Sequence, residues 1–156
     1  MDKKIVTKGI CYRCKQQVTK TSAKSHINKC FNLGDELTDS NAFLVKVQWP
    51  HKSPIYWLYL AVPFKATLEQ LDEFLRETWL ECCGHLSQFT INGNRFSSDF
   101  EPNPYSSIEE FPMTISSEIV LALGLKFIHE YDFGSTTELL LEVVDLIKIE
   151  ITKKLV

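Results

Sequence analysis

The chain lacks any apolar run long enough to cross a membrane. Its longest apolar stretches cover residues 55–62 and 119–125, well below the ~18 residues that a spanning helix needs. Its first residues, Met-Asp-Lys-Lys-Ile-Val-Thr-Lys, carry charge but no apolar core, so the sequence predicts no secretory signal. We therefore expect a cytoplasmic protein that makes no membrane contact.

The chain also lacks internal repeats and low-complexity runs, the marks of solenoids and disordered proteins. Of its 156 residues, 44% are hydrophobic and 12% are aromatic. This composition is typical of a folded globular protein. The length is enough for one ordinary domain plus a small appendage.

Cysteine is scarce, yet three of the five cysteines lie with a histidine in one short segment. Cys11, Cys14, His26 and Cys30 follow the spacing Cys-x2-Cys-x11-His-x3-Cys. Two cysteines three positions apart can bind one ion, and His26 and Cys30 would lie one turn apart on a helix. Four such ligands close a tetrahedron, which predicts a structural zinc ion rather than a catalytic one. A disulfide or incidental cysteines are the alternative, but the ligand order and both short spacings favour zinc.

The segment resembles Cys-Cys-His-Cys zinc fingers over residues 8–31. The resemblance implies a knuckle or hairpin, then a helix that begins near Thr21 or Ser22. The loop is one residue shorter than the usual spacing of about twelve in two-Cys, two-His fingers, and the fourth ligand is Cys. These departures weaken any transfer of a base-reading code. With few apolar residues, the segment should need its metal to fold.

Charge is unevenly distributed along the chain. Residues 1–30 hold eight Lys or Arg against one Asp, whereas the remainder holds nine bases against nineteen acids. A basic arm attached to an acidic body is typical of a protein whose arm binds a polyanion. We predict that the basic residues of the finger contact nucleic acid: Lys8, Arg13, Lys15, Lys20, Lys24 and Lys29. The alternative is that these lysines serve only to keep the finger soluble.

The pattern of apolar residues predicts an α+β protein in three parts. The basic finger covers residues 1–31, a polar linker 32–41 and an α+β domain 42–156. A mostly antiparallel sheet should pack against one main helix. Alternating or β-branched runs predict strands over residues 42–49, 55–62, 88–92, 95–97, 126–132, 138–144 and 146–152.

The main helix is expected to follow a capping box formed by Thr67 and Gln70 and to run to about Leu80. Its predicted apolar stripe is Leu68, Leu71, Phe74, Leu75, Thr78 and Trp79. Asn92-Gly93 predicts a tight hairpin. Residues 98–117 predict a long loop, and residues 116–123 fit a helical turn or a strand equally well.

Four stretches of the body occur in an order that resembles the plasmid pRiA ORF-three-like family. They are Ser-Pro54-Ile-Tyr-Trp-Leu-Tyr-Leu-Ala-Val-Pro63, Thr67-Leu-Glu-Gln-Leu-Asp-Glu-Phe-Leu, His85-Leu-Ser-Gln-Phe89 and Tyr131-Asp-Phe-Gly134. The resemblance covers about residues 42–150 and implies a compact α+β fold without an established activity. The family usually has Trp-Arg-Arg where this chain has Trp57-Leu-Tyr, and Asp, Trp and His where Ser135-Thr-Thr-Glu-Leu stands. A polar site kept there by the family would be lost or altered.

Two acidic patterns have an enzymatic and a structural interpretation. Asp132-Phe133-Gly134 spells the magnesium triplet of protein kinases, but the chain is too short and lacks a glycine-rich loop. A turn that Asp132 caps, with glycine at positive φ, is the favoured interpretation. A hydrolase would draw on the cluster of His129, Glu130, Asp132 and Glu138. On a strand, however, His129 and Glu130 point to opposite faces.

Two further groups have a binding and a structural interpretation. Cys82, Cys83 and His85 could bind a second metal ion, although no fourth ligand is nearby in the sequence. Alternatively, the two cysteines form a small buried pair that closes the helix. The aromatic residues Tyr56, Trp57 and Tyr59 fit base stacking or, as we favour, the core.

The favoured function is a non-enzymatic zinc-binding accessory protein. Its finger would contact nucleic acid, and its body would bind another protein or form a homodimer. Domains of the resembled family occur in mobile-element proteins. This favours a role as an accessory to a larger nucleic-acid enzyme, such as a transposition enzyme or an RNA-guided nuclease. A pure protein–protein adaptor and a metal-dependent hydrolase are the alternatives.

Overall fold

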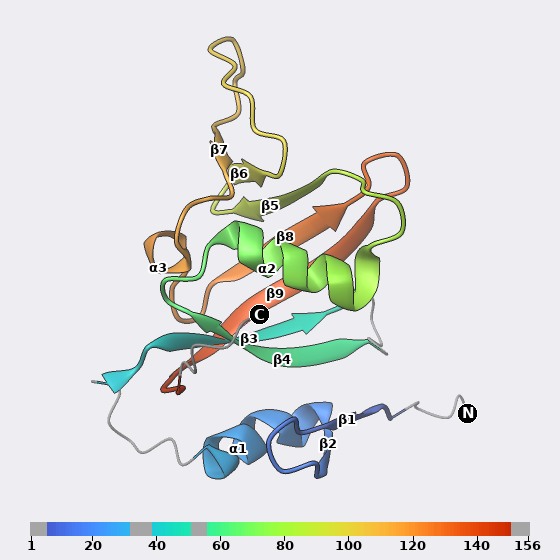
Figure 1. The fold of residues 1–156 in the computed structure, drawn as a ribbon, viewed down its shortest axis with the longest axis vertical. Coiled ribbons are helices and arrows are strands. Elements are labelled where there is room, and N and C mark those ends of the chain that lie inside the picture. The colour runs from blue at the N-terminus through green and yellow to red at the C-terminus, as the bar shows by residue number, and fades with distance from the viewer. Residues whose placement is uncertain (1–5, 32–38, 51–55, 151–156) are drawn as a thin grey trace.

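The computed structural model describes residues 6–31, 39–50 and 56–150, which form a small hairpin-and-helix module and a larger α+β body (Figure 1). The module contains β1 (Lys8–Ile10), β2 (Gln17–Thr19) and α1 (Lys20–Cys30). The elements of the body are β3 (Ala42–Gln48), β4 (Trp57–Pro63), α2 (Leu68–Leu75), the π-helical turn η2 (Arg76–Leu80), β5 (Ser87–Ile91), β6 (Asn94–Ser97), β7 (Glu110–Pro112), α3 (Ser117–Val120), β8 (Lys126–Tyr131) and β9 (Thr137–Ile147). No helix among these residues is long and apolar enough to span a membrane.

The predicted α+β class is confirmed. The seven strands of the body form one sheet in the order β4-β3-β9-β8-β5-β6-β7, and every pairing is antiparallel except that of β6 with β7. Helix α2 lies across one face of this sheet (Figure 1). The main core is between them and includes Val45, Leu68, Phe89 and Leu141, all fully buried.

Helix α2 begins as predicted, and the helical segment ends at the predicted Leu80, but its last turn is π-helical. Thr67 Oγ1 accepts a hydrogen bond from the Gln70 amide at 3.2 Å, and the Gln70 side chain accepts one from the Thr67 amide at 3.0 Å, so the capping box is confirmed. After Leu75 the chain widens into η2, where residue 81 donates its amide proton to the carbonyl of residue 76. The wider turn rotates the following side chains outward. Thr78 and Trp79 are therefore exposed, and Phe74, which precedes η2, is also 46% exposed. Leu68, Leu71 and Leu75 are buried as predicted, so the predicted apolar stripe is wrong at Phe74, Thr78 and Trp79.

The hairpin at Asn92-Gly93 is confirmed, because both residues adopt the positive φ that a tight turn between β5 and β6 requires. The predicted loop over residues 98–117 is wrong at one point, since it contains β7. This strand pairs with β6, and Phe111 stacks on Phe96 with ring centroids 5.4 Å apart. The undecided segment at residues 116–123 forms the short helix α3.

The two strands predicted for the C-terminal part are one continuous strand, β9. Its register against β3 shifts between Leu44 and Val45, which pair with Asp145 and Val143 and leave Val144 without a partner. This β-bulge explains why the alternation of the sequence is interrupted there. The linker residues 32–38, the turn residues 51–54 and residues 151–152 of the last predicted strand lie outside the described residues.

The hairpin-and-helix module packs on the face of the sheet opposite α2. Ala42, Leu44 and Ile147 form a second buried cluster there, with Ile27 of α1 and Tyr59 of β4 packed against it. β3 is therefore buried on both faces near its start, where the sequence predicted a half-buried strand. Leu44, on the face away from α2, is only 2% exposed.

Candidate metal centre and finger interface

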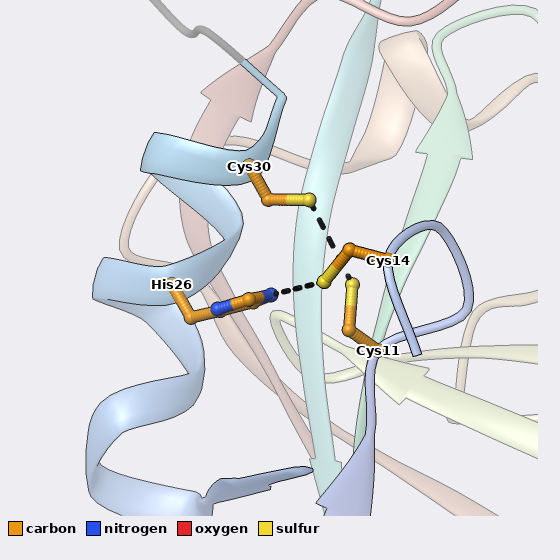
Figure 2. A group of neighbouring side chains, drawn as sticks. All are labelled: Cys11, Cys14, His26 and Cys30. Carbon is orange, nitrogen blue, oxygen red and sulfur yellow. Dashed lines mark hydrogen bonds between the residues drawn. The ribbon is translucent and has the colours of Figure 1, made fainter. Parts of the chain in front are cut away.

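The structure brings the four predicted metal ligands together. Cys11 and Cys14 lie at the turn between β1 and β2, and His26 and Cys30 project from α1 towards them (Figure 2). Cys11 Sγ lies 4.0 Å from Cys30 Sγ, and Cys14 Sγ lies 3.3 Å from His26 Nε2. All four ligand atoms lie within 4.8 Å of one another. Tetrahedral bonds of about 2.3 Å to sulfur and about 2.0 Å to nitrogen would separate ligand atoms by about 3.5–3.8 Å. The cluster can therefore hold one metal ion.

Local hydrogen bonds set this geometry. The Cys11 amide donates to the Gln16 carbonyl and the Lys15 amide to the Cys11 carbonyl, both at 2.9 Å. Helix α1 is capped by Thr19, whose Oγ1 accepts from the Ser22 amide at 3.2 Å while Ser22 Oγ accepts from the Thr19 amide. The helix therefore begins at Lys20, one or two residues before the predicted start at Thr21 or Ser22, and Ser22 serves as the third helical residue of the box.

The thiols of the cluster differ in their pKa values. Burial acts to raise the pKa of Cys11, but hydrogen bonds from the backbone of Cys14, the side chain of His26 and the backbone of Arg13 outweigh it and lower the pKa to about 6. Burial, followed by the thiols of Cys14 and Cys11, raises the pKa of Cys30 to about 11. Cys11 is thus ready to bind a cation at neutral pH, and a cation that binds all four ligands displaces the proton of Cys30.

The finger's basic residues fall into two groups. Residues 6–31 contain six Lys or Arg and no Asp or Glu. Lys8, Lys15 and Lys29 are exposed, and none of them forms an ion pair within the described ranges. Arg13, also exposed, closes the finger: its Nη1 donates to the Cys30 carbonyl at 3.1 Å, and its guanidinium lies 5.0 Å from the Phe31 ring centroid.

Lys20 and Lys24 form the second group, at the interface with the sheet. Lys24 Nζ donates to the Val144 carbonyl at 2.9 Å and lies 3.4 Å from Asp145 Oδ2. Burial, and then the charge of Lys46, lower the pKa of Lys20. Two of the six residues predicted to contact nucleic acid therefore lie against the body.

The predicted core aromatics contribute to the same interface. Trp57 Nε1 donates to Thr7 Oγ1 at 2.7 Å, and a Cβ atom on Gly9 would approach Cη2 of Trp57 to 2.9 Å. Trp57 and Tyr59 are half-buried beneath the finger, whereas Tyr56 is 60% exposed. Assigning all three to the core was wrong, because the finger covers only two of them.

The hydrolase cluster does not assemble. His129 is fully buried, and its Nε2 lies 2.6 Å from Oδ1 of the buried Asp72. Glu130 points to the other face of the sheet, where it accepts a hydrogen bond from Gln88 and lies opposite Glu138. Asp132 stands apart in a turn, so the four side chains occupy three different places.

Sequence reasoning missed the role of Asp72. Its carboxylate joins α2 to β8 through His129 and lies 3.5 Å from Nη1 of Arg76. One signal was available: an acid at position 72 falls among Leu68, Leu71 and Leu75 on the buried face of the helix. A charge at such a position needs a buried partner.

The turn at Asp132-Phe133-Gly134 has the predicted cap but a different strained residue. Asp132 Oδ1 accepts from the amides of Gly134 at 3.1 Å and Ser135 at 3.4 Å. Positive φ occurs at Asp132 (59°) rather than at the glycine. Aspartate tolerates this conformation because its side chain bonds to the local backbone.

Cys82, Cys83 and His85 form a second group whose ligand atoms lie within 4.8 Å of one another. Both cysteines are exposed, so the prediction of a buried pair is wrong.

Comparisons with known proteins support the fold alone. No family model matches the chain, and no curated protein sequence matches it. The structure is similar to the crystal structure of MM3350, a protein of unknown function from Methanosarcina mazei Go1, with a TM-score of 0.63 and 12% sequence identity. The similarity covers 76% of this chain and 68% of that one. The resemblance to the plasmid pRiA ORF-three-like family remains a prediction.

Proposed function

We propose that this protein is a non-enzymatic accessory protein whose zinc-stabilised finger contacts the backbone of a nucleic acid. One observation carries the proposal: the described part of the finger holds six basic residues and no acidic one, around a four-ligand metal cluster. A surface of one sign attracts a polyanion and speeds its association.

Zinc is the ion that the ligand set favours. Three thiols and one imidazole are soft and borderline ligands, which suit a tetrahedral d10 ion, whereas magnesium and calcium prefer oxygen. A closed four-ligand site leaves no position for a substrate, so the ion would stabilise the finger.

The exposed bases determine the mode of contact. Lys8, Lys15 and Lys29 carry compact charges that suit phosphate, and Arg13 is held by Cys30 and Phe31. Helix α1 turns Ala23 and Ile27 towards the body, which limits its entry into a major groove. Backbone contact without base reading is the mode this arrangement favours.

The acidic body would bind a protein partner or a second copy of the chain. An open groove of about 710 Å³ supports this role, because it is lined by Trp49, Tyr56, Trp79 and Leu80 beside the start of β9. Aromatic residues of this kind are enriched at interfaces. The further proposal that this protein assists mobile-element or RNA-guided nuclease machinery rests on the family resemblance.

The test is a salt titration of binding to duplex DNA and to RNA. Lys8→Gln, Lys15→Gln and Lys29→Gln together should weaken binding and flatten the salt dependence, whose log–log slope is about −0.9 per contacted phosphate on duplex DNA. Lys65→Gln, Arg95→Gln and Lys126→Gln remove the same charge from exposed sites of the body and serve as the matched control.

Equal slopes for the finger variant and the wild-type protein would refute nucleic-acid contact and favour the adaptor. A hydrolytic turnover abolished by Glu130→Gln or Asp132→Asn would favour the hydrolase.

A further inference from the structure

The loop that follows η2 gathers soft ligands at a point remote in sequence from the finger. Cys82 Sγ lies 3.0 Å from Cys83 Sγ, and Cys83 Sγ lies 2.9 Å from His85 Nε2. Asp132 reaches the group from the turn after β8, with its Oδ2 3.6 Å from the same His85 nitrogen. Two thiols and an imidazole thus converge in the loop, and the carboxylate of Asp132 adjoins the imidazole from a second segment of the chain.

The loop is held by a network that continues into the body. Tyr131 Oη accepts from the amides of Cys82 at 3.4 Å and His85 at 3.3 Å, and donates to Glu81 Oε1 at 3.0 Å. The same carboxylate accepts from the Gly84 amide, and Arg76 Nε donates to its other oxygen at 2.8 Å. Gly84 provides the positive φ (77°) that turns the chain back. The ligands are therefore placed by bonds to the backbone on either side of them.

Two other chemistries fit the group poorly. A nucleophile–histidine–carboxylate relay uses both ring nitrogens, one for the nucleophile and one for the carboxylate. Here the thiol of Cys83 and the carboxylate of Asp132 approach the same nitrogen. A disulfide between adjacent cysteines is also disfavoured, because a trans peptide holds their Cα atoms about 3.8 Å apart, short of the usual range of about 4.4–6.8 Å.

We propose that Cys82, Cys83 and His85 form a second metal site for a thiophilic d10 divalent cation such as Zn²⁺, with Asp132 as the fourth ligand. Both thiols are exposed, so rotation of their side chains can open the sulfur–sulfur distance to the roughly 3.8 Å found on such an ion. The site is more open to solvent than the finger cluster, in which only Cys14 is exposed and Cys11 is buried. Its cation exchanges faster than that of the finger and is reachable by an outside ligand.

The experiment measures zinc bound to the full chain by equilibrium dialysis against a chelator-buffered series of free zinc concentrations, with a phosphine reductant present. The wild-type protein should bind two zinc ions per chain. Cys82→Ser with Cys83→Ser should bind one, with the thermal melt of the body retained. Cys14→Ser with Cys30→Ser should also bind one, which separates this site from the proposed finger site.

A second readout identifies the ligands. With ¹¹³Cd²⁺ the full chain should give two NMR resonances, and the one from the site with fewer thiolates should vanish in the Cys82→Ser, Cys83→Ser variant. Asp132→Asn, which keeps the turn because asparagine also tolerates positive φ, should weaken the second affinity about tenfold. Asp99→Asn, an exposed acid elsewhere, should leave it unchanged.

One zinc ion in both the wild-type protein and the Cys82→Ser, Cys83→Ser variant overturns the proposal. A disulfide between Cys82 and Cys83 under the same reductant overturns it as well. One ion in the wild-type protein that disappears only with Cys82 and Cys83 would instead support this site and refute the finger site.

Discussion

Lys24 Nζ lies 2.9 Å from the carbonyl oxygen of Val144, a residue 120 positions away in the sequence. Val144 is the residue that the β-bulge leaves without a cross-strand partner, so the lysine satisfies an acceptor that the ladder does not. Asp145, next to it, adds an ion pair at 3.4 Å. A basic residue of the finger thus holds the finger against the body.

The first prediction concerns this contact. Lys24→Met keeps the aliphatic stem but removes the ammonium group, and the free energy of unfolding should fall by about 1–2 kcal/mol because the Val144 carbonyl loses its partner. Lys29→Met, on the same helix but without a partner among the described residues, should change it by less than about 0.5 kcal/mol. Urea denaturation measures both values. Equal losses in the two variants would show that the Lys24 contact contributes nothing.

The second prediction tests the close approach of β1 to Trp57. Gly9→Ala places a methyl group 2.9 Å from Cη2 of the indole, so either the hairpin or the indole ring must shift. We expect a destabilisation of about 1–3 kcal/mol, as for other overpacked sites. Gly134→Ala is the matched control, because its new Cβ would meet its nearest atom at 3.4 Å. A melting temperature unchanged by Gly9→Ala would contradict the interface.

The third prediction is the result of removing the metal. Chelation should unfold the finger and leave the sheet folded, because α1 and the hairpin have little core of their own while the main core lies on the far side of the sheet. Trp57 should then lose its contact with Thr7, and its fluorescence should shift to longer wavelength. Trp57→Phe should abolish that shift. A chelated protein with full helical circular dichroism would show that the finger needs no ion.

The fourth prediction compares the isolated body with the whole chain. A truncation that begins at Ser40 should still unfold cooperatively, since its core of Val45, Phe89 and Leu141 is complete. It should be less stable than the full chain, because Leu44 and Ile147 become exposed and each contributes about 1.5–3 kcal/mol when buried. Size-exclusion chromatography should also show self-association through this face. Equal stability of the two proteins would mean that the finger does not cover the sheet.

The fifth prediction is a pH dependence at the loop after η2. The amide of Gly84, and then Arg76, hold the pKa of Glu81 below its usual 4.5. A lowered folded-state pKa contributes stability above the unfolded value, and that stability is lost as the pH falls through the folded value. Glu81→Gln should therefore cost stability at pH 7 and progressively less below pH ~4.5. Glu77→Gln, at an exposed site on the same turn, is the control for the removal of a carboxylate.

The metal cluster and the element types could be predicted because their signals are local. Cys11, Cys14, His26 and Cys30 lie within twenty residues, so hairpin and helix geometry alone determine which side chains meet. The Thr67 capping box and the Asn92-Gly93 turn are equally short in range. The helical segment ends at Leu80 as predicted, but its last turn is π-helical, which the apolar pattern did not indicate.

The sequence by itself determined a four-ligand cluster, an α+β sheet protein and a finger without acidic residues from position 6 to 31. Only the tertiary structure decided which bases lie against the body, because Lys24 contacts a bulge formed far along the chain. It also decided that His129 is a core residue bonded to Asp72 and that Asp132 lies beside His85. Strand alternation assigns a side chain to a face of the sheet, but what covers that face depends on contacts between distant segments, which no local pattern encodes.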